Sequence, residues 1–284
     1  VNLSDLCLDV EELSKWLKKN TKMINGNCIN LKTKRRISTI LLVHVYGFFS
    51  NRNKIYEIVK SKNIKIIEDG AEALGSNFMK KPIANGASIF TLSFNGNKII
   101  TSGGGGMVLC KNKKIADKVR YLANQAKASH YDFIHNEVGF NYRLSNVSAA
   151  IGLAQLEKLD DFVQIKRNTF KQYKFFFDNE TVGKMVEEDR HTECNYWIPL
   201  LRINEALNVN VFDLIKEMNK IGIQIRPIWK PLNLNKAFNN YETTSVLKVS
   251  KALYKNTIGL PSSTSISSKD IKIVCEKLMY FLNK

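Results

Sequence analysis

The chain has 284 residues, of which 44% are hydrophobic, so it can bury a large core and is not a disordered protein. Its formal net charge of +17 is spread through every segment and forms no basic tract interleaved with aromatic residues, which argues against a nucleic-acid-binding protein. A basic field of this kind still favours a small anionic ligand.

The chain has no pattern of a secreted or membrane-spanning protein. No apolar run reaches the length needed to span a bilayer, and no basic-then-apolar signal sequence opens the chain. The cysteines are odd in number, widely spaced and never paired as Cys-x-x-Cys, which predicts neither a disulfide framework nor a zinc site: Cys7, Cys28, Cys110, Cys194 and Cys275. We therefore expect a cytoplasmic protein with no membrane partner.

The first half of the chain alternates helix-like and strand-like patterns. Residues 6–17 have a helix-like pattern, and three runs rich in Ile, Leu, Val and Phe predict strands buried on both faces, at 37–45, 64–69 and 88–94. Between the first two runs, Ile55, Ile58 and Val59 are spaced as in a helix. A strand, a helix and a strand in this order predict a parallel sheet with a right-handed crossover.

A further strand is predicted at 105–111, and an amphipathic helix follows at 112–127. Ser145 is a helix-capping residue, and the apolar spacing after it predicts one long helix, with room for a kink, as far as Phe177.

The pattern changes to shorter units beyond Asp178. We predict strands and helices in alternation, with Gly222 ending the first helix: strand 195–203, helix 211–222, strand 223–229 and helix 268–283. The sequence therefore predicts two domains, residues 1–178 and 179–284, with the long helix as their bridge.

Polar residues lie just beyond two of the predicted strands. Asp69 ends the run at 64–69, and Lys98 follows the run at 88–94 and precedes the glycines Gly103 to Gly106. Because reactive groups of parallel sheets gather beyond the carboxyl ends of the strands, we expect both side chains at the same edge. Taken alone, Asp69 is more readily explained as a helix cap or part of a solvated turn, and Lys98 as part of a glycine-rich turn.

Several long motifs in a fixed order carry a family resemblance: IIEDGAEALGS, LSFNGNKIITSGGGGMVL, EVGFNYRLSNVSAAIGLAQLEKLDDF and IRPIWKPL. With these motifs the chain resembles the DegT/DnrJ/EryC1/StrS family of pyridoxal-phosphate-dependent sugar aminotransferases. The resemblance implies an α/β fold of the fold-type-I class, with a mostly parallel-sheet large domain that lacks the family's N-terminal part and a small C-terminal α/β domain.

The resemblance assigns roles toward pyridoxal phosphate, the family's cofactor. Lys98 matches the lysine that bonds covalently to the cofactor and later moves a proton between adjacent carbons. Asp69 matches the carboxylate that faces the pyridine nitrogen and favours its protonated form. Ser93 matches a phosphate-contacting serine, and Glu72 a polar residue beside the ring hydroxyl. Asn141 matches a residue that reaches the cofactor phosphate of the neighbouring subunit, which implies a homodimer with a shared active site.

On the substrate side, Arg226, Trp229 and Lys230 resemble a segment whose cation and aromatic ring suit a diphosphate and a flat base, although a structural strand explains them about as well. His44 matches a recurrent position near the cofactor, but a lone histidine in a strand is more often a packing residue. Arg143 is at a helix start and is equally explained by pairing with a carboxylate.

The motifs FNGNK and IRPIWKPL are most similar to the branch that makes 4-amino-4,6-dideoxy sugars for bacillosamine and legionaminic acid. The implied reaction moves an amino group from L-glutamate to the 4-keto position of a UDP-linked 4-keto-6-deoxy-N-acetylhexosamine. The keto sugar and the stereochemistry of the aminated carbon stay open.

The sequence departs from the family pattern in three ways. Gly70 replaces the usual alanine, Asn233 replaces a histidine common in this branch, and the N-terminal segment that holds the cofactor phosphate is absent. We therefore expect a fragment of a working enzyme.

Three other functions compete with the aminotransferase. A pyridoxal-phosphate-dependent sugar dehydratase usually has histidine at the position of Lys98. A truncated, catalytically inactive subunit of the same family would dimerise without turnover. A basic nucleic-acid binder would show salt-sensitive retention on a polynucleotide.

Overall fold

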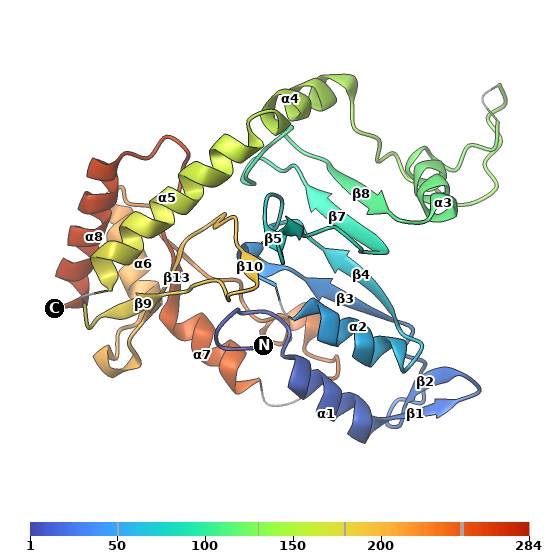
Figure 1. The fold of residues 1–284 in the computed structure, drawn as a ribbon, viewed down its shortest axis with the longest axis horizontal. Helices are drawn as coiled ribbons and strands as arrows, with labels where there is room; N and C mark the ends of the chain where they lie inside the picture. The colour runs from blue at the N-terminus through green and yellow to red at the C-terminus, as the bar shows by residue number, and fades with distance from the viewer. Residues whose placement is uncertain (50, 130, 179, 245–246, 284) are drawn as a thin grey trace.

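The computed structural model describes residues 1–49, 51–129, 131–178, 180–244 and 247–283. A mostly parallel sheet forms one side of the molecule, an antiparallel sheet with its own helices forms the other, and a long helical segment runs diagonally between them (Figure 1).

The mostly parallel sheet carries the predicted strands of the first half of the chain. Its strands lie in the order β3-β4-β7-β8, with bounds β3 Thr39–Val43, β4 Lys65–Asp69, β7 Ile89–Ser93 and β8 Gly106–Cys110. The first three strands are parallel, as predicted, whereas β8 is antiparallel to β7. No helix lies in the link between β7 and β8, and a short link of this kind returns the chain in the opposite direction.

Helices α1 (Val10–Asn20) and α2 (Arg52–Lys60) pack beside β3 and β4, and confirm the helical patterns predicted there. Their apolar residues meet Leu42 of β3 in one buried cluster. Leu41 and Val43, its neighbours in the strand, are exposed. The prediction that this strand is buried on both faces is therefore wrong, because within the described chain α1 and α2 pack on the Leu42 side alone.

Short antiparallel strands extend this part of the molecule. The hairpin β1 (Thr21–Ile24) and β2 (Asn27–Asn30) turns at Asn25 and Gly26, whose φ angles are +48° and +74°. This hairpin was not predicted. A second small sheet joins β5 (Asn77–Phe78), β6 (Lys81–Pro82) and β10 (Thr192–Glu193) in the order β10-β5-β6.

The helical bridge consists of two helices, α4 (Asn146–Leu156) and α5 (Leu159–Phe177). Ser145 caps α4 as predicted, because its side chain accepts a hydrogen bond from the backbone N–H of Ser148. The helical run is interrupted at Glu157 and Lys158, so the predicted single helix is two helices. The predicted helix at 112–127 is α3 and ends early, at Lys113–Ala123.

The antiparallel sheet lies in the second half of the chain, with strand order β12-β13-β11-β9. Its strands are β9 Gly183–Met185, β11 Leu200–Ile203, β12 Arg226–Pro227 and β13 Thr257–Gly259. Its helices are α6 Val211–Lys220, α7 Lys248–Asn256 and α8 Ser268–Leu282. Short 3-10 turns lie at Val45–Gly47, Glu205–Leu207, Leu232–Leu234 and Lys236–Phe238. The predicted helices are confirmed, but the strands predicted at 195–203 and 223–229 shorten to β11 and β12.

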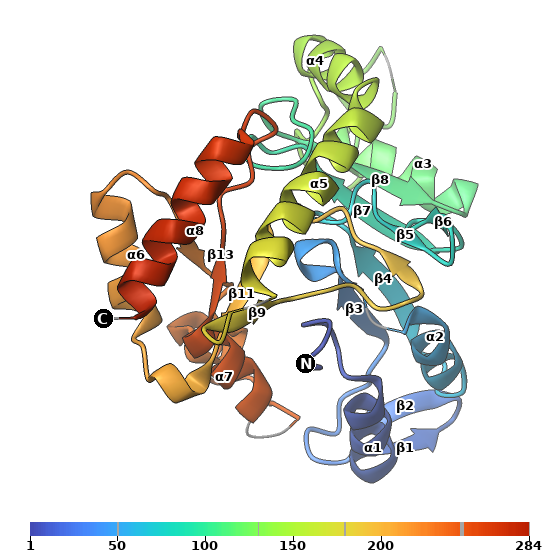
Figure 2. The same ribbon diagram turned by 60° about the vertical axis from the view of Figure 1, so that its left-hand side comes forward.

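The largest buried cluster joins both halves of the molecule. It contains Phe94 and Ile100 beside β7, Phe170 and Tyr173 of α5, and Leu278 of α8. Figure 2 shows α5 and α8 lying close together. The core therefore continues across residue 178, and the division at that residue stays a prediction. None of the helices in the described ranges is both long and apolar enough to cross a bilayer.

Candidate functional site

Lys98 lies in the turn after β7, and its side chain is 13% exposed. Its Nζ lies 3.4 Å from Oε1 of Glu72 and 4.2 Å from the centre of the Trp197 ring. The amine is therefore held between a carboxylate and an aromatic face, both of which attract a cation.

Glu72 accepts hydrogen bonds from three separate parts of the chain. Its Oε2 accepts from the backbone N–H of Tyr46 at 2.7 Å, and its Oε1 accepts from the indole Nε1 of Trp229 at 3.0 Å as well as from Lys98. Burial raises the pKa of Glu72, although the bond from Tyr46 and the charge of Lys98 oppose that rise. Glu72 thus ties the turn after β4 to the loop after β12.

Three aromatic rings stack beside Lys98 and Glu72, those of Tyr46, Trp197 and Trp229. Tyr46 is stacked with Trp197 and with Trp229, at centroid distances of 5.9 and 6.1 Å. The hydroxyl of Tyr46 accepts a hydrogen bond from the backbone N–H of Trp229 at 2.9 Å. Trp229 comes from the second half of the chain and is 55% exposed, so one wall of the site is open to solvent.

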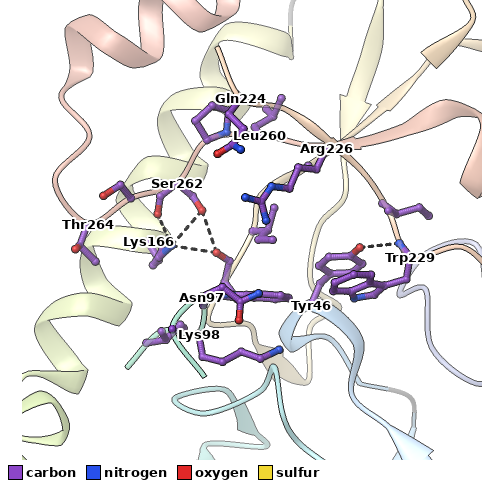
Figure 3. Close-up of a pocket in the computed structure, with 18 of the residues that line it drawn as sticks. Tyr46, Asn97, Lys98, Lys166, Gln224, Arg226, Trp229, Leu260, Ser262 and Thr264 are labelled. Carbon is purple, nitrogen blue, oxygen red and sulfur yellow. Dashed lines mark hydrogen bonds between the residues drawn. The ribbon is translucent and has the colours of Figure 1, made fainter. Parts of the chain in front are cut away.

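A cavity of about 780 Å³ opens beside Lys98 (Figure 3). Four cationic side chains line it: Lys98, Lys166, Arg226 and Lys230. None of the described residues that line it is an aspartate or glutamate, so the cavity suits an anionic ligand. The structure thus brings Arg226, Trp229 and Lys230 to the same cavity as Lys98.

Asp69 is the last residue of β4 and pairs with Thr91 in the register of β7. Its Oδ1 accepts hydrogen bonds from the backbone N–H of Ala71 at 3.0 Å and from the Thr91 hydroxyl at 3.5 Å. Ser93 ends β7, and its hydroxyl accepts from the backbone N–H of Asn95 at 3.3 Å. Both residues lie at the predicted strand ends, but neither lines the cavity beside Lys98.

Behind Asp69 lies a buried polar network centred on Glu68. His44 Nε2 lies 2.9 Å from Oε2 of Glu68, and Oε1 receives Arg52 at 2.9 Å and the Tyr56 hydroxyl at 2.6 Å. Burial acts to raise the pKa of Glu68, but the bonds from His44 and Tyr56 and the charge of Arg52 outweigh it and the pKa is lowered. His44 also packs parallel to a phenylalanine ring, that of Phe90, which agrees with a packing role.

Asn141 and Arg143 are exposed and are not among the residues that line the cavity. Asn141 forms an isolated antiparallel bridge with Asn124, just after α3. Within a single chain, neither residue joins the group around Lys98. Among the described residues, no cluster of three or more His, Cys, Asp or Glu side chains could hold a metal ion.

Three residues of this site were not predicted from the sequence: Tyr46, Lys166 and Trp197. Lys166 had a signal in the sequence, because it occupies the apolar stripe of α5 between Val163 and Phe170. A lysine at such a position is buried and needs polar partners. Tyr46 and Trp197 had no such signal in the sequence, because their contacts join residues from the two halves of the chain.

The chain is similar to known proteins in sequence and in fold. GDP-perosamine synthase from Escherichia coli O157:H7 is 32% identical over 256 residues, which cover 89% of this chain and 68% of the relative. UDP-4-amino-4,6-dideoxy-N-acetyl-beta-L-altrosamine transaminase from Campylobacter jejuni (strain 81-176) is 27% identical over 257 residues, with coverage of 89% and 68%. The chain spans about two thirds of the length of the curated relatives it matches, and in one case 63%.

The crystal structure of a DegT DnrJ EryC1 StrS aminotransferase from Brucella abortus superposes with a TM-score of 0.86 at 21% identity. That match covers 100% of this chain and 72% of the other, and it shows a shared fold. The model of the DegT/DnrJ/EryC1/StrS aminotransferase family matches residues 2–279. This match over nearly the whole sequence shows that the chain belongs to the DegT/DnrJ/EryC1/StrS aminotransferase family.

Proposed function

We propose that the protein is a pyridoxal-phosphate-dependent aminotransferase acting on a nucleotide sugar. In the proposed reaction, L-glutamate donates an amino group that is transferred to the 4-keto position of a UDP-linked 4-keto-6-deoxy-N-acetylhexosamine. The observation that carries the proposal is the position of the Lys98 amine at a cavity with four cations and no lining carboxylate among the described residues. Both substrates are anions, and the relatives named above act on nucleotide sugars.

The residues fit the proposed cofactor in the chemistry of their donor groups. Lys98 provides a partly buried primary amine, and Asp69 provides a carboxylate at the end of an adjacent strand. None of the ion pairs found in the described ranges engages Asp69, so its charge is available to a protonated pyridine nitrogen. The Ser93 hydroxyl ends the neighbouring strand and suits a phosphate oxygen.

Pyridoxal phosphate, when bound, supplies an aldehyde carbon and an electron-withdrawing ring. The proposed role of Lys98 is to hold the cofactor and then to take and return a proton at its Nζ. Glu72 would orient that amine through the 3.4 Å contact, and Asp69 would keep the ring charged. Arg226 and Lys230 would bind the diphosphate, and Trp229 would stack on the base.

We also propose a homodimer in the cytoplasm, the compartment that the wide spacing of the cysteines in the sequence favours. In that dimer Asn141 would reach the cofactor phosphate of the partner subunit. This role is supported by its exposure and by the fact that it does not line the cavity of its own chain.

The experiment is reductive labelling. The protein is mixed with pyridoxal phosphate, reduced with borohydride and digested, and the modified lysine is located by mass spectrometry. We expect the adduct on Lys98, and we expect Lys98→Ala to lower amino transfer by roughly a thousandfold or more. Lys111→Ala, which removes an exposed lysine just after β8, serves as the matched control and should keep full activity.

Labelling of other lysines only, or normal turnover by Lys98→Ala, contradicts the proposal. The same assay separates the alternatives. A sugar dehydratase would give a keto sugar that has lost a hydroxyl group and gained no amino group, and an inactive subunit would turn over neither substrate. Assays with UDP-linked and GDP-linked keto sugars identify the nucleotide.

A further inference from the structure

Lys166 of α5 is a buried cation on the wall of the candidate site. The residue is only 7% exposed. Its ammonium donates to the carbonyl oxygen of Trp197 at 3.0 Å, to the hydroxyl of Ser262 at 3.1 Å and to the carbonyl oxygen of Ser262 (Figure 3). The Ser262 hydroxyl itself donates to the same Trp197 carbonyl at 3.0 Å.

No ion pair found in the described parts of the chain engages Lys166. Burial lowers its pKa to about 8, and no neighbouring charge contributes to that shift. A buried ammonium without a carboxylate is costly unless all of its protons are hydrogen-bonded. Here three oxygen atoms accept the three protons of the ammonium. Through these bonds, which we call the Lys166 clamp, the side chain connects three segments: α5, the segment before β11 and the segment after β13.

The clamped residue, Trp197, is in direct contact with Lys98. Its ring centre lies 4.2 Å from the Lys98 Nζ, and its indole Nε1 donates to the carbonyl of Asn97 at 2.6 Å. Its backbone N–H donates to Oδ1 of Asn195 at 2.8 Å. The indole therefore touches both the amine of Lys98 and the backbone just before it, and its own backbone is fixed by Asn195 on one side and Lys166 on the other.

We propose that Lys166 is a positioning residue for Lys98: by holding the carbonyl groups of Trp197 and Ser262, it fixes the indole that sets the place of the Lys98 amine. The inference deepens the proposed function and rests on it for the importance of Lys98. The contacts themselves belong to the folded chain and can be tested without the cofactor.

The first measurement is the rate at which Lys98 is acylated by acetic anhydride, followed by peptide mass spectrometry on the full chain. We expect Lys166→Met, which keeps the length of the side chain and removes its donors, to change this rate by about tenfold, since a cation–aromatic contact and a hydrogen bond are lost together. Lys166→Arg keeps the charge and the donors and should restore most of the wild-type rate.

Lys171→Met is the matched control, because Lys171 lies on the same helix and is exposed. It should leave the rate unchanged. Ser262→Ala removes only the hydroxyl partner and is a milder variant should Lys166→Met not fold. We expect it to change the rate in the same direction and by less.

The second measurement repeats the borohydride labelling with pyridoxal phosphate on the same variants. We expect Lys166→Met to need about ten times more cofactor for half-labelling of Lys98, with Lys166→Arg close to wild type. A changed acylation rate without any cofactor adduct on wild-type Lys98 would reject the proposed function and keep the clamp. Unchanged acylation in both Lys166→Met and Ser262→Ala would reject the clamp, whatever the labelling shows.

Discussion

Because Lys166 is buried, its protonation state affects the stability of the folded protein. The ordinary pKa of a lysine is 10.5, and that of Lys166 falls to about 8 in the folded protein. Between these two pH values the unfolded chain binds a proton that the folded chain has released. Stability therefore rises with pH in this window. Below pH 8 the folded state carries a buried charge and has no such advantage.

We expect the free energy of unfolding of the wild type, relative to Lys166→Met, to increase between pH 8 and pH 10.5. A shift from 10.5 to about 8 corresponds to about 3 kcal/mol over the whole window. Urea unfolding of both proteins at several pH values measures the difference, in which the other lysines cancel. Lys171→Met should show no pH-dependent difference, and a constant gap between wild type and Lys166→Met would contradict the expectation.

The individual site residues differ in how far the sequence alone could predict them. Lys98 and Asp69 are foreseeable because each follows a strongly apolar run, and the edge of a parallel sheet is where such residues gather. Trp197 is not foreseeable, since its contact with Lys98 joins positions 99 residues apart and depends on how the two halves of the molecule pack. Lys166 is intermediate, because its place on an apolar helix face predicts burial and does not identify its partners.

Among the elements, the turn after β4 is closely packed against α5. Gly75 in this turn has a φ of +82°, and a Cβ atom there would lie 2.5 Å from a methyl carbon of Val163. Gly222, just after α6, has a nearly equal φ of +81° with open space around it. The two glycines share the same backbone conformation and differ in packing.

Replacing each glycine by alanine separates the cost of backbone strain from the cost of a steric clash. We expect Gly222→Ala to cost about 1 kcal/mol, from backbone strain alone. Gly75→Ala should cost about 2 to 4 kcal/mol, because a steric clash with Val163 adds to the strain. Denaturant unfolding measures both, and the expectation fails if the two variants lose the same stability.

Elements with a long, regular apolar pattern were predicted well, and short elements were not. The helix predicted at 268–283 is α8, Ser268–Leu282, and the strand predicted at 64–69 is β4. The hairpin at Asn25 and Gly26 was missed although this dipeptide is a strong turn signal, because its four-residue strands lack an alternating pattern. Strand length in the second half depends on hydrogen bonding to neighbours, which local sequence does not determine.

At the scale of the whole molecule, the segment 131–142, which includes Asn141, carries several exposed apolar residues. Tyr131, Phe133, Val138 and Tyr142 are each more than three quarters exposed, at 94%, 83%, 86% and 77%. A contiguous stretch of large apolar residues on a surface marks an interaction site more often than a free surface. Its position beside Asn141 supports the proposed dimer.

We expect the double variant Val138→Glu and Tyr142→Glu to weaken self-association by roughly a hundredfold or more, because two apolar contacts are replaced by charges. Sedimentation equilibrium of wild type and variant measures the effect. Phe175→Glu, at another exposed aromatic residue, on α5, is the control and should associate like the wild type. A wild type that stays monomeric at high concentration would contradict the dimer.

The contacts of Lys166 also determine when, during translation, the surroundings of Lys98 become complete. Ser262 lies 164 residues after Lys98. At about 5 to 20 residues per second, roughly 8 to 33 seconds separate the synthesis of the two. During that interval the nascent chain carries the reactive amine without the indole fixed in place, so the amine should reach its final reactivity toward aldehydes only after Ser262 has been synthesised.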